Sequence, residues 1–234
     1  MEATSVTRGD LVVITGAGRG IGREAALQFA RHRWRVLVTY HRDPGAAETV
    51  AGECRRAGAP DAWAWELDVR EPASIRGFSD RLFERFGEVT ALVNNAGVIV
   101  WNPLSEQTEE EIRSQLETNL VGAILLTRAL LPYVRETVIQ VGSDLGYAGM
   151  AELAPYCATK FGLRGFCQAL AQERPDLRFL CVNPDRTATS MNRFQGRDPR
   201  VAGEVIWRAA AGHYGVASGG DVNVWEVVAQ EAAG

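Results

Sequence analysis

The sequence predicts a doubly wound parallel α/β sheet of about seven strands, with helices on both faces. Short apolar runs alternate with stretches of helix length from residue 10 to the end of the chain. Several runs are apolar on both sides, which is typical of strands that helices cover on both faces. No linker-like stretch interrupts the alternation. We therefore expect one domain over residues 10–234, preceded by a flexible N-terminal tail at 1–9.

The expected strands are short runs with enough sequence between them for a helix. Such connections favour parallel neighbours with right-handed crossovers. The strands are expected at Leu11–Thr15, Arg35–Tyr40, Ala62–Leu67, Val89–Asn94, Thr137–Gly142, Leu177–Val182 and Asp221–Val227.

The helices between these strands carry start signals. The first helix has an apolar face at i, i+4 and i+8, formed by Ile21, Ala25 and Phe29. Asp43 followed by Pro44 is typical of an N-cap and a proline at the first helical position. Thr108 and Glu111 have the spacing of a capping box, so the acidic cluster there indicates a helix start rather than a metal site.

Composition and charge narrow the classes of function. The 234 residues are 46% hydrophobic and 23% charged, with a net charge of −4, so a nucleic-acid partner is not expected. The four cysteines have no CxxC pair and no metal-type spacing with the histidines, which indicates reduced thiols and no metal site. The first nine residues lack the apolar core of a signal peptide, and the apolar runs are too short to span a membrane. We expect a cytoplasmic protein with no membrane contact.

Tyr156 and Lys160 give the strongest chemical signal. Four residues apart on one helix, they face the same way, with about 5–6 Å between their Cβ atoms. A cation beside a phenol favours the phenolate, so we expect Lys160 to lower the pKa of Tyr156 toward the range useful for proton transfer. Ser143 follows a predicted strand and is placed to hold a carbonyl oxygen next to the phenol. The same spacing also occurs on ordinary helices, so its meaning depends on the rest of the chain.

A glycine-rich turn, Thr15–Gly22, lies directly between the first strand and the first helix. Glycines let the backbone turn sharply and approach a pyrophosphate, while the helix N-terminus offers free N–H donors and a favourable dipole. In this position the turn predicts a dinucleotide site and a sheet of the Rossmann type.

Further motifs follow in order, and together they resemble the short-chain dehydrogenase/reductase (SDR) family over residues 10–228. The glycine turn reads TGxxxGxG, and an NNAG motif follows the fourth strand. The other matches are Asn119, Ser143, Tyr156 with Lys160, Asn183 with Pro184, Thr189 and Met191.

The resemblance implies an oxidoreductase that moves a hydride between a nicotinamide cofactor and a small-molecule carbonyl. Tyr156 would be the general acid or base, and Ser143 would orient the substrate oxygen. Lys160 would also bind the nicotinamide ribose, and Asn119 would hold a water in a proton relay. The cofactor contacts that the resemblance implies are Gly16, Arg19, Gly20, Ile21, Gly22, Asp68, Val69, Asn95, Ala96, Gly97, Lys160, Pro184 and Thr189.

The end of the second strand indicates which cofactor is bound. NAD enzymes usually carry Asp or Glu there for the ribose 2′-hydroxyl. This chain has no carboxylate before Asp43, which is the expected N-cap. An arginine can pair with a 2′-phosphate instead. We therefore expect NADPH/NADP+, with Arg42 as the first candidate for that phosphate and Arg19 as the second. NADH/NAD+ is the alternative.

The chain departs from the family pattern at several places. Asp185 follows Pro184 where the family usually has glycine; a desolvated carboxylate there would favour the oxidised cofactor, whereas a solvent-facing one would not. Arg33 stands where many members have a helix-ending glycine, which raises the question of backbone strain. Only nine residues, 192–200, separate Met191 from the next predicted helix. So short a lid suggests an open cleft, or one that another subunit completes.

The substrate-pocket candidates follow from position along the chain and are mostly apolar or aromatic. They are Trp101, Tyr147, Met150, Met191 and Phe194. Such a set suits a bulky hydrophobic or aromatic ketone, so a ketone reductase or alcohol dehydrogenase is the leading interpretation.

Two alternatives stay open. One is a 3-oxoacyl-thioester reductase, and the other is a non-catalytic protein that senses NADP(H). Sensors commonly lose the Tyr–Lys pair, which is present here. A homodimer or homotetramer is also expected, joined through the helix before Tyr133 and the helix that starts near Tyr156.

Overall fold

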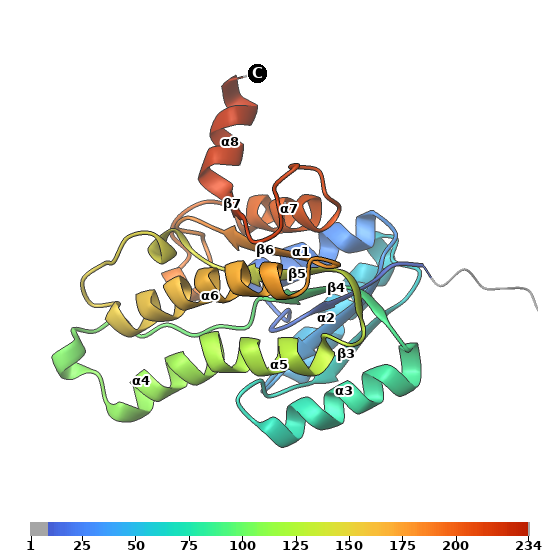
Figure 1. Cartoon of the computed structure of the whole chain (residues 1–234), viewed down its shortest axis with the longest axis horizontal. Helices are drawn as coiled ribbons and strands as arrows, with labels where there is room; N and C mark the ends of the chain where they lie inside the picture. Colours follow the sequence, from blue (N-terminus) through green and yellow to red (C-terminus); the bar gives the residue numbers. More distant parts are fainter. Residues whose placement is uncertain (1–8, 234) are drawn as a thin grey trace, which may run out of the picture.

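The computed structural model describes residues 9–233 and contains a sheet of seven parallel strands in the order β3-β2-β1-β4-β5-β6-β7 (Figure 1). The tail predicted at 1–9 lies outside the described residues except for Gly9. The strands are β1 Leu11–Ile14, β2 Arg35–Tyr40, β3 Ala62–Glu66, β4 Val89–Asn94, β5 Val134–Val141, β6 Arg178–Asn183 and β7 Asp221–Asn223. The predicted Rossmann-type sheet is therefore confirmed.

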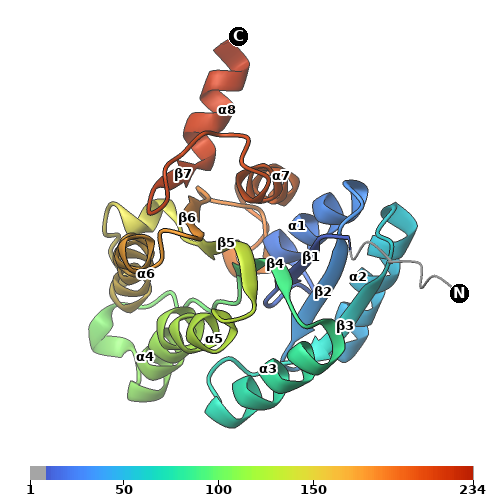
Figure 2. The same ribbon diagram turned by 45° about the vertical axis from the view of Figure 1, so that its right-hand side comes forward.

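Helices cover both faces of the sheet, as Figure 2 shows. α1, α2 and α7 pack on one face, and α3, α5 and α6 on the other. The helices are α1 Gly20–Arg31, α2 Pro44–Ala57, α3 Pro72–Phe86, α4 Glu109–Leu116, α5 Gly122–Leu130, α6 Ala154–Glu173, α7 Pro199–Ala210 and α8 Val224–Ala233. No helix among the described residues is long and apolar enough to cross a membrane.

The strands are apolar on both sides because two separate cores lie against them. In β1, Val12 and Ile14 face the core under α1, α2 and α7. Leu11 and Val13 face the core under α3, α5 and α6. All four side chains are at most 1% exposed, which explains the continuous apolar run in the sequence.

The predicted helix starts are confirmed. Asp43 accepts a hydrogen bond of 2.9 Å from the N–H of Ala46, and Pro44 opens α2. Thr108 and Glu111 form both bonds of a capping box at α4. Arg33 has φ 64°, so a non-glycine residue takes the left-handed conformation after α1, at a cost of about 1 kcal/mol.

The last predicted strand, Asp221–Val227, is wrong in its second half. β7 ends at Asn223, and Val224 begins α8, which extends away from the sheet (Figure 1). Val224, Val227 and Val228 are apolar at i, i+3 and i+4, which is helical spacing. A short apolar run fits either a strand or a helix, and here the residues after Asn223 form a helix.

The carboxyl ends of the strands meet along one edge of the sheet. β1 and β4 are neighbours there, although the chain leaves β1 toward β2 on one side and continues from β4 toward β5 on the other. Ligands of open α/β sheets bind in the crevice at such a switch point. The predicted site residues after β1, β4, β5 and β6 all follow strand ends at this edge.

Candidate active site

Tyr156 and Lys160 lie one turn apart near the start of α6. Both side chains are buried, with relative exposures of 7% and 5%. Lys160 Nζ donates a hydrogen bond of 2.8 Å to the carbonyl oxygen of Val141, the last residue of β5. It also stands 5.4 Å from the centroid of the Tyr156 ring. The amine is thus held between the end of a central strand and the phenol.

Ser143 reaches the same place from the turn after β5. Its side chain lies near enough to the phenol of Tyr156 to lower the pKa of that phenol. The Ser143 hydroxyl also donates to Asp144 Oδ1 at 2.7 Å and accepts from the N–H of Leu145 at 3.1 Å. The contact between the Asp144 carboxylate and the Ser143 hydroxyl was not predicted from the sequence.

Burial shifts the pKa values of both ionisable groups away from their charged forms. The pKa of Tyr156 is raised, first by burial, while the hydrogen bond to Ser143 lowers it and the charge of Asp144 raises it further. Burial lowers the pKa of Lys160 from 10.5 to about 8. The expectation that Lys160 lowers the pKa of Tyr156 is therefore not met in this structure: burial is the largest cause of the raised pKa, and Lys160 is not among the causes.

Asn119 lies on a single π-helical turn, Glu117–Val121, between α4 and α5. Its amide oxygen accepts from the N–H of Val98 at 2.7 Å, and its Nδ2 donates to the Val98 carbonyl at 2.8 Å. Nδ2 also lies 3.4 Å from Oγ1 of Thr159, the residue before Lys160. All four predicted catalytic residues are therefore brought together. Isolated π turns are frequent at functional sites, but hydrophobic periodicity gives no sign of one, and the sequence analysis missed it.

Thr15, the first residue of the predicted glycine turn, links the ends of β1 and β4. Its Oγ1 accepts hydrogen bonds of 2.9 Å from the N–H groups of both Asn95 and Ala96. Asn95 Nδ2 in turn donates to the carbonyl oxygens of Thr15 at 2.8 Å and Gly16 at 3.3 Å. A Cβ on Gly16, which has φ 63°, would lie 3.0 Å from Ala96 Cα, so this turn needs glycine.

The N-terminus of α1 offers donors that no side chain of its own satisfies. Arg19 is the N-cap, yet it makes no capping bond, and the first turn holds no acidic residue. Gly20 has φ 58°, and a Cβ there would lie 3.3 Å from Thr189 Cγ2. A Cβ on Gly22 would lie 2.4 Å from Asn95 Nδ2. The predicted cofactor residues around α1 and after β4 and β6 are thus neighbours, and Ile21 packs against the core beside them.

The end of β2 carries no free carboxylate. Asp68, after β3, pairs with Arg70 at 2.7 Å and with His41 at 3.1 Å. The hydrogen bond from Arg70 is the main cause of the lowered pKa of Asp68. Arg42 is exposed and has no ion pair among residues 9–233. It lines a hollow of about 550 Å³ together with Arg70, Glu109, Glu110, Arg113, Ser114 and Glu117.

The substrate-pocket candidates lie in the segments that follow β4, β5 and β6. Trp101, Tyr147, Met150 and Phe194 are exposed, and Met191 is half-buried. The N–H of Asn102 donates to the Glu152 carbonyl at 3.2 Å, which brings the Trp101 and Met150 loops together.

Tyr147 is engaged elsewhere. Its hydroxyl donates to Asn223 Oδ1 at 2.9 Å, and the Arg164 guanidinium lies 3.5 Å from the centroid of its ring. Tyr147 therefore links the turn after β5 to β7 and α6, and its hydroxyl already has a hydrogen-bond partner.

Two partly buried apolar side chains lie near the phenol. Ile99 and Leu145 pack with Tyr156 in a small apolar cluster that also contains Leu153 and Cys157. They come from the segments after β4 and β5, which meet only in the folded chain. A substrate carbonyl at Tyr156 would therefore have apolar neighbours.

The Asp185 carboxylate is neither desolvated without a partner nor free in solvent. Its carboxylate forms a two-pronged ion pair with Arg197, with Nη2 to Oδ2 at 2.7 Å and Nε to Oδ1 at 3.0 Å. Its backbone is not left-handed, so the replacement of the usual glycine causes no strain of that kind. The charge of Asp185 is balanced within the chain.

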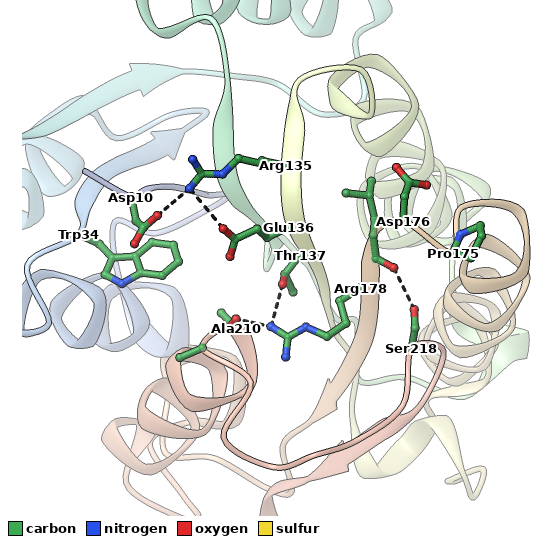
Figure 3. A pocket seen from close by; sticks show the side chains of 12 residues that line it. Asp10, Trp34, Arg135, Glu136, Thr137, Pro175, Asp176, Arg178, Ala210 and Ser218 are labelled. Carbon is green, nitrogen blue, oxygen red and sulfur yellow. Dashed lines mark hydrogen bonds and ion pairs between the residues drawn. The ribbon is translucent and has the colours of Figure 1, made fainter. Parts of the chain in front are cut away.

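A second hollow, of about 720 Å³, lies at the amino ends of the strands, opposite the candidate site (Figure 3). Its charged groups already have partners: Arg135 pairs with Asp10 at 2.8 Å and Glu136 at 3.3 Å. Arg178 donates to Thr137 Oγ1 at 2.9 Å. The hollow contains none of the predicted site residues, so size alone would point to the wrong edge of the sheet.

Comparison with known proteins agrees with this geometry. The family model described as short chain dehydrogenase matches residues 10–200. Human 17-beta-hydroxysteroid dehydrogenase 13 is 36% identical over 169 residues, which is 70% of this chain. The chain spans only a little more than half of that relative, 56%.

Two further proteins match over most of their length. The 3-oxoacyl-(acyl-carrier-protein) reductase of Escherichia coli K12 is 33% identical over 88% of this chain and 84% of its own. A short chain dehydrogenase from Burkholderia cenocepacia, solved in complex with NADP, superimposes with a TM-score of 0.86. It is 24% identical and covers 92% of this chain and 96% of its own. The chain belongs to the short-chain dehydrogenase family.

Proposed function

We propose that the protein is an NADP(H)-dependent oxidoreductase that interconverts a bulky hydrophobic or aromatic ketone and its secondary alcohol. The observation that carries this proposal is the buried group of Tyr156, Ser143 and Lys160. It lies at the edge of the sheet where the uncapped start of α1 also lies.

The residues at the end of β1 fit a dinucleotide. The first turn of α1 has unsatisfied N–H groups and no carboxylate that would repel a pyrophosphate. Gly16 and Gly20 leave the backbone uncovered there, and Asn95 holds the turn in place. Together with Thr189 over Gly20, these residues would hold the adenosine and nicotinamide halves on either side of the turn.

Each catalytic side chain has a defined task in this proposal. The nicotinamide supplies or accepts the hydride when the cofactor is bound. Tyr156 Oη donates the proton to the carbonyl oxygen during reduction and takes it back during oxidation. Ser143 Oγ orients that oxygen, which requires its proton to turn from Asp144 toward the substrate.

Lys160 supplies a compact positive charge beside the phenol. Because its pKa is about 8, the ammonium form predominates over the amine at neutral pH. Asn119 fixes the backbone of Val98 and the start of α6 through Thr159, and would anchor the water of the proton relay.

The preference for NADP(H) rests on charge at the end of β2. Asp43 is occupied as an N-cap and Asp68 is paired with Arg70 and His41, so no free carboxylate is available for a ribose 2′-hydroxyl among these residues. Arg42 and Arg19 are both exposed. We propose Arg42 as the main partner of the 2′-phosphate, with Arg19 second, and NAD(H) as the alternative cofactor.

A 3-oxoacyl-thioester reductase is the second candidate function. The match to the E. coli reductase over most of both chains favours it. Against it, the exposed side chains near the cleft, Trp101, Met150 and Phe194, are large and apolar and suit a wide ring better than a narrow acyl chain. A sensor without turnover has less support, because it gives no reason for an intact Tyr156 and Lys160.

We also propose a homodimer or homotetramer. Val121, directly before α5, and Phe161 on α6 are 43% and 44% exposed. Apolar side chains at these positions are consistent with burial against a second copy.

The test is oxidation of NADPH, with NADH in parallel, across three carbonyls: a polycyclic aromatic ketone, a 3-oxoacyl thioester and a small aliphatic ketone. We expect turnover of the polycyclic ketone with NADPH. The Tyr156→Phe variant should lose about 10²–10⁴-fold in kcat and still bind NADPH. Turnover of the thioester alone would favour the second candidate, and NADPH binding without any turnover would favour a sensor.

The cofactor preference has its own test. Arg42→Ala should weaken NADPH more than NADH, measured by fluorescence titration, with Arg19→Ala as the comparison. Equal losses for both cofactors in both variants would contradict the assignment of either arginine to the 2′-phosphate.

A further inference from the structure

The segment from Asp185 to Arg197 closes on itself. Besides the ion pair between these two residues, the N–H of Arg197 donates to the Arg186 carbonyl at 2.8 Å, and the N–H of Ala188 donates to the Arg197 carbonyl at 2.7 Å. A β-bridge joins Thr187 to Arg197. The two ends are therefore held together by the backbone and by charge, as in an Ω-loop.

The inside of this loop is also tied. Phe194 N–H donates to the Thr189 carbonyl at 2.8 Å, and Asn192 Nδ2 donates to the Thr187 carbonyl at 3.2 Å. Arg193 and Phe194 have φ values of 52° and 58°. Two consecutive non-glycine residues in the left-handed conformation persist only where the surrounding structure holds them.

The base of the loop spans the catalytic edge of the sheet. On one side, the carbonyl of Pro184 accepts a hydrogen bond of 3.0 Å from the N–H of Asp144, next to Ser143. On the other side, Thr189 lies next to Gly20 at the start of α1, where a Cβ added to Gly20 would be 3.3 Å from Thr189 Cγ2. The loop therefore stands between the substrate oxygen site and the pyrophosphate site, where the nicotinamide ring would lie.

We propose that the Asp185–Arg197 ion pair is a clamp that makes residues 186–196 one rigid lid over the nicotinamide end of the cleft. Asp185 and Arg197 are positioning residues that act through the loop. Their side chains are 24% and 30% exposed, so the pair is better shielded than an ordinary surface pair. The clamp lets a short lid keep a fixed shape and presents Phe194, which is 75% exposed, at its tip.

Limited proteolysis tests the clamp without any turnover. Trypsin cleavage after Arg193, followed by mass spectrometry, should be at least about tenfold faster in Arg197→Met than in the wild type, because cleavage follows the open population of the loop. Arg200→Met is the matched control, since it breaks the nearby Asp198–Arg200 pair, whose side chains are 42% and 69% exposed, and should cleave at the wild-type rate.

The charge-swapped double variant Asp185→Arg/Arg197→Asp separates the ion pair from other effects at these positions. It should return cleavage to within about threefold of the wild type, because it restores the opposite charges. Equal cleavage of Arg197→Met, Arg200→Met and the wild type would overturn the clamp. So would a charge-swapped variant that is cleaved as fast as Arg197→Met.

The location of the lid is tested with two saturating ligands on the wild type. NADPH should slow cleavage after Arg193, whereas 2′-phospho-ADP-ribose, which lacks the nicotinamide, should not. Equal protection by both ligands, or none by either, would overturn the placement over the nicotinamide. This part rests on the proposed cofactor, and NADPH binding by fluorescence checks that separately. The comparison of variants stands even if no carbonyl is reduced.

Discussion

Replacing Lys160 by methionine should make the protein more stable at neutral pH while abolishing its proposed activity. Lys160 is the only lysine in the sequence. All the other side chains of the Lys and Arg type are arginines. Its pKa is lowered by burial from 10.5 to about 8, which corresponds to ~3.4 kcal/mol at about 1.36 kcal/mol per pKa unit. That free energy is the cost of keeping the ammonium charged inside the folded protein.

The sign follows from which state binds the proton more tightly. Between pH 8 and 10.5 the unfolded chain keeps the proton and the folded protein releases it, so the free energy of unfolding rises with pH across this window. Below pH 8 the cost is fully present. Methionine removes this cost but leaves the Val141 carbonyl without its hydrogen bond, which costs about 1–3 kcal/mol.

The net effect changes sign with pH. At pH 7, Lys160→Met should be more stable than the wild type by roughly 0.5–2.5 kcal/mol, and at pH 10.5 it should be less stable by about 1–3 kcal/mol. Urea unfolding of both proteins at a series of pH values measures the difference, in which the titration of all other groups cancels.

A direct measurement of the Lys160 pKa accompanies the unfolding series. Because the chain has one lysine, ¹³Cε-labelled lysine gives a single side-chain NMR signal to titrate. A variant that is less stable than the wild type at pH 7, or a difference that does not vary with pH, would refute the reasoning. So would a Lys160 signal that titrates near 10.5.

Four further substitutions test other parts of the structure. Gly22→Ala places a Cβ 2.4 Å from Asn95 Nδ2 and should weaken NADPH binding at least about tenfold, since the amide must move; fluorescence titration measures this. Thr108→Ala removes the capping box of α4 and should cost about 1 kcal/mol in urea unfolding with kcat unchanged. Arg164→Met removes the ion-pair partner of Asp221; the side chains of Arg164 and Asp221 are 20% and 19% exposed. The free energy of unfolding should fall by about 3 kcal/mol. Arg113→Met is its control, because it breaks an ion pair with Glu109 in which the two side chains are 65% and 78% exposed. It should lower the free energy of unfolding by less than about 0.5 kcal/mol.

Much of the fold could be predicted from the sequence because its signals are local. Six of the seven strands were placed nearly correctly, since each is a short apolar run bounded by turns. The N-cap at Asp43 and the capping box at Thr108 depend on residues three apart. α8 was missed because its start continues an apolar run, and a run of that length fits a strand or a helix.

In the candidate site, too, the features that depend on neighbouring residues could be predicted, and those that depend on the folded chain could not. The spacing of Tyr156 and Lys160 and the glycine turn could be predicted, because one helix turn or one strand end fixes them. The pKa values could not, because they depend on burial by both layers of the fold. The partner of Asp185 could not either: Arg197 lies twelve residues away, and only the closed loop brings the two together.

The helix N-termini differ in whether a side chain caps them. α2, α4 and α7 each have a side chain at the N-cap that accepts a backbone hydrogen bond. α3 and α6 lack such a bond, but each has a proline in its first turn, which removes one free N–H donor. α1, whose first turn faces the end of β4, has Arg19 at the N-cap with neither a cap bond nor a proline. The same edge holds the one buried lysine, whose charge is unfavourable in the folded state. Departures from local stability are expected where a ligand completes the structure. An anion on the N–H groups of α1 would supply the missing cap, and a ribose hydroxyl beside Lys160 would give its ammonium a polar partner. The two unfavourable features therefore point to one ligand that carries both groups, which is the composition of a dinucleotide.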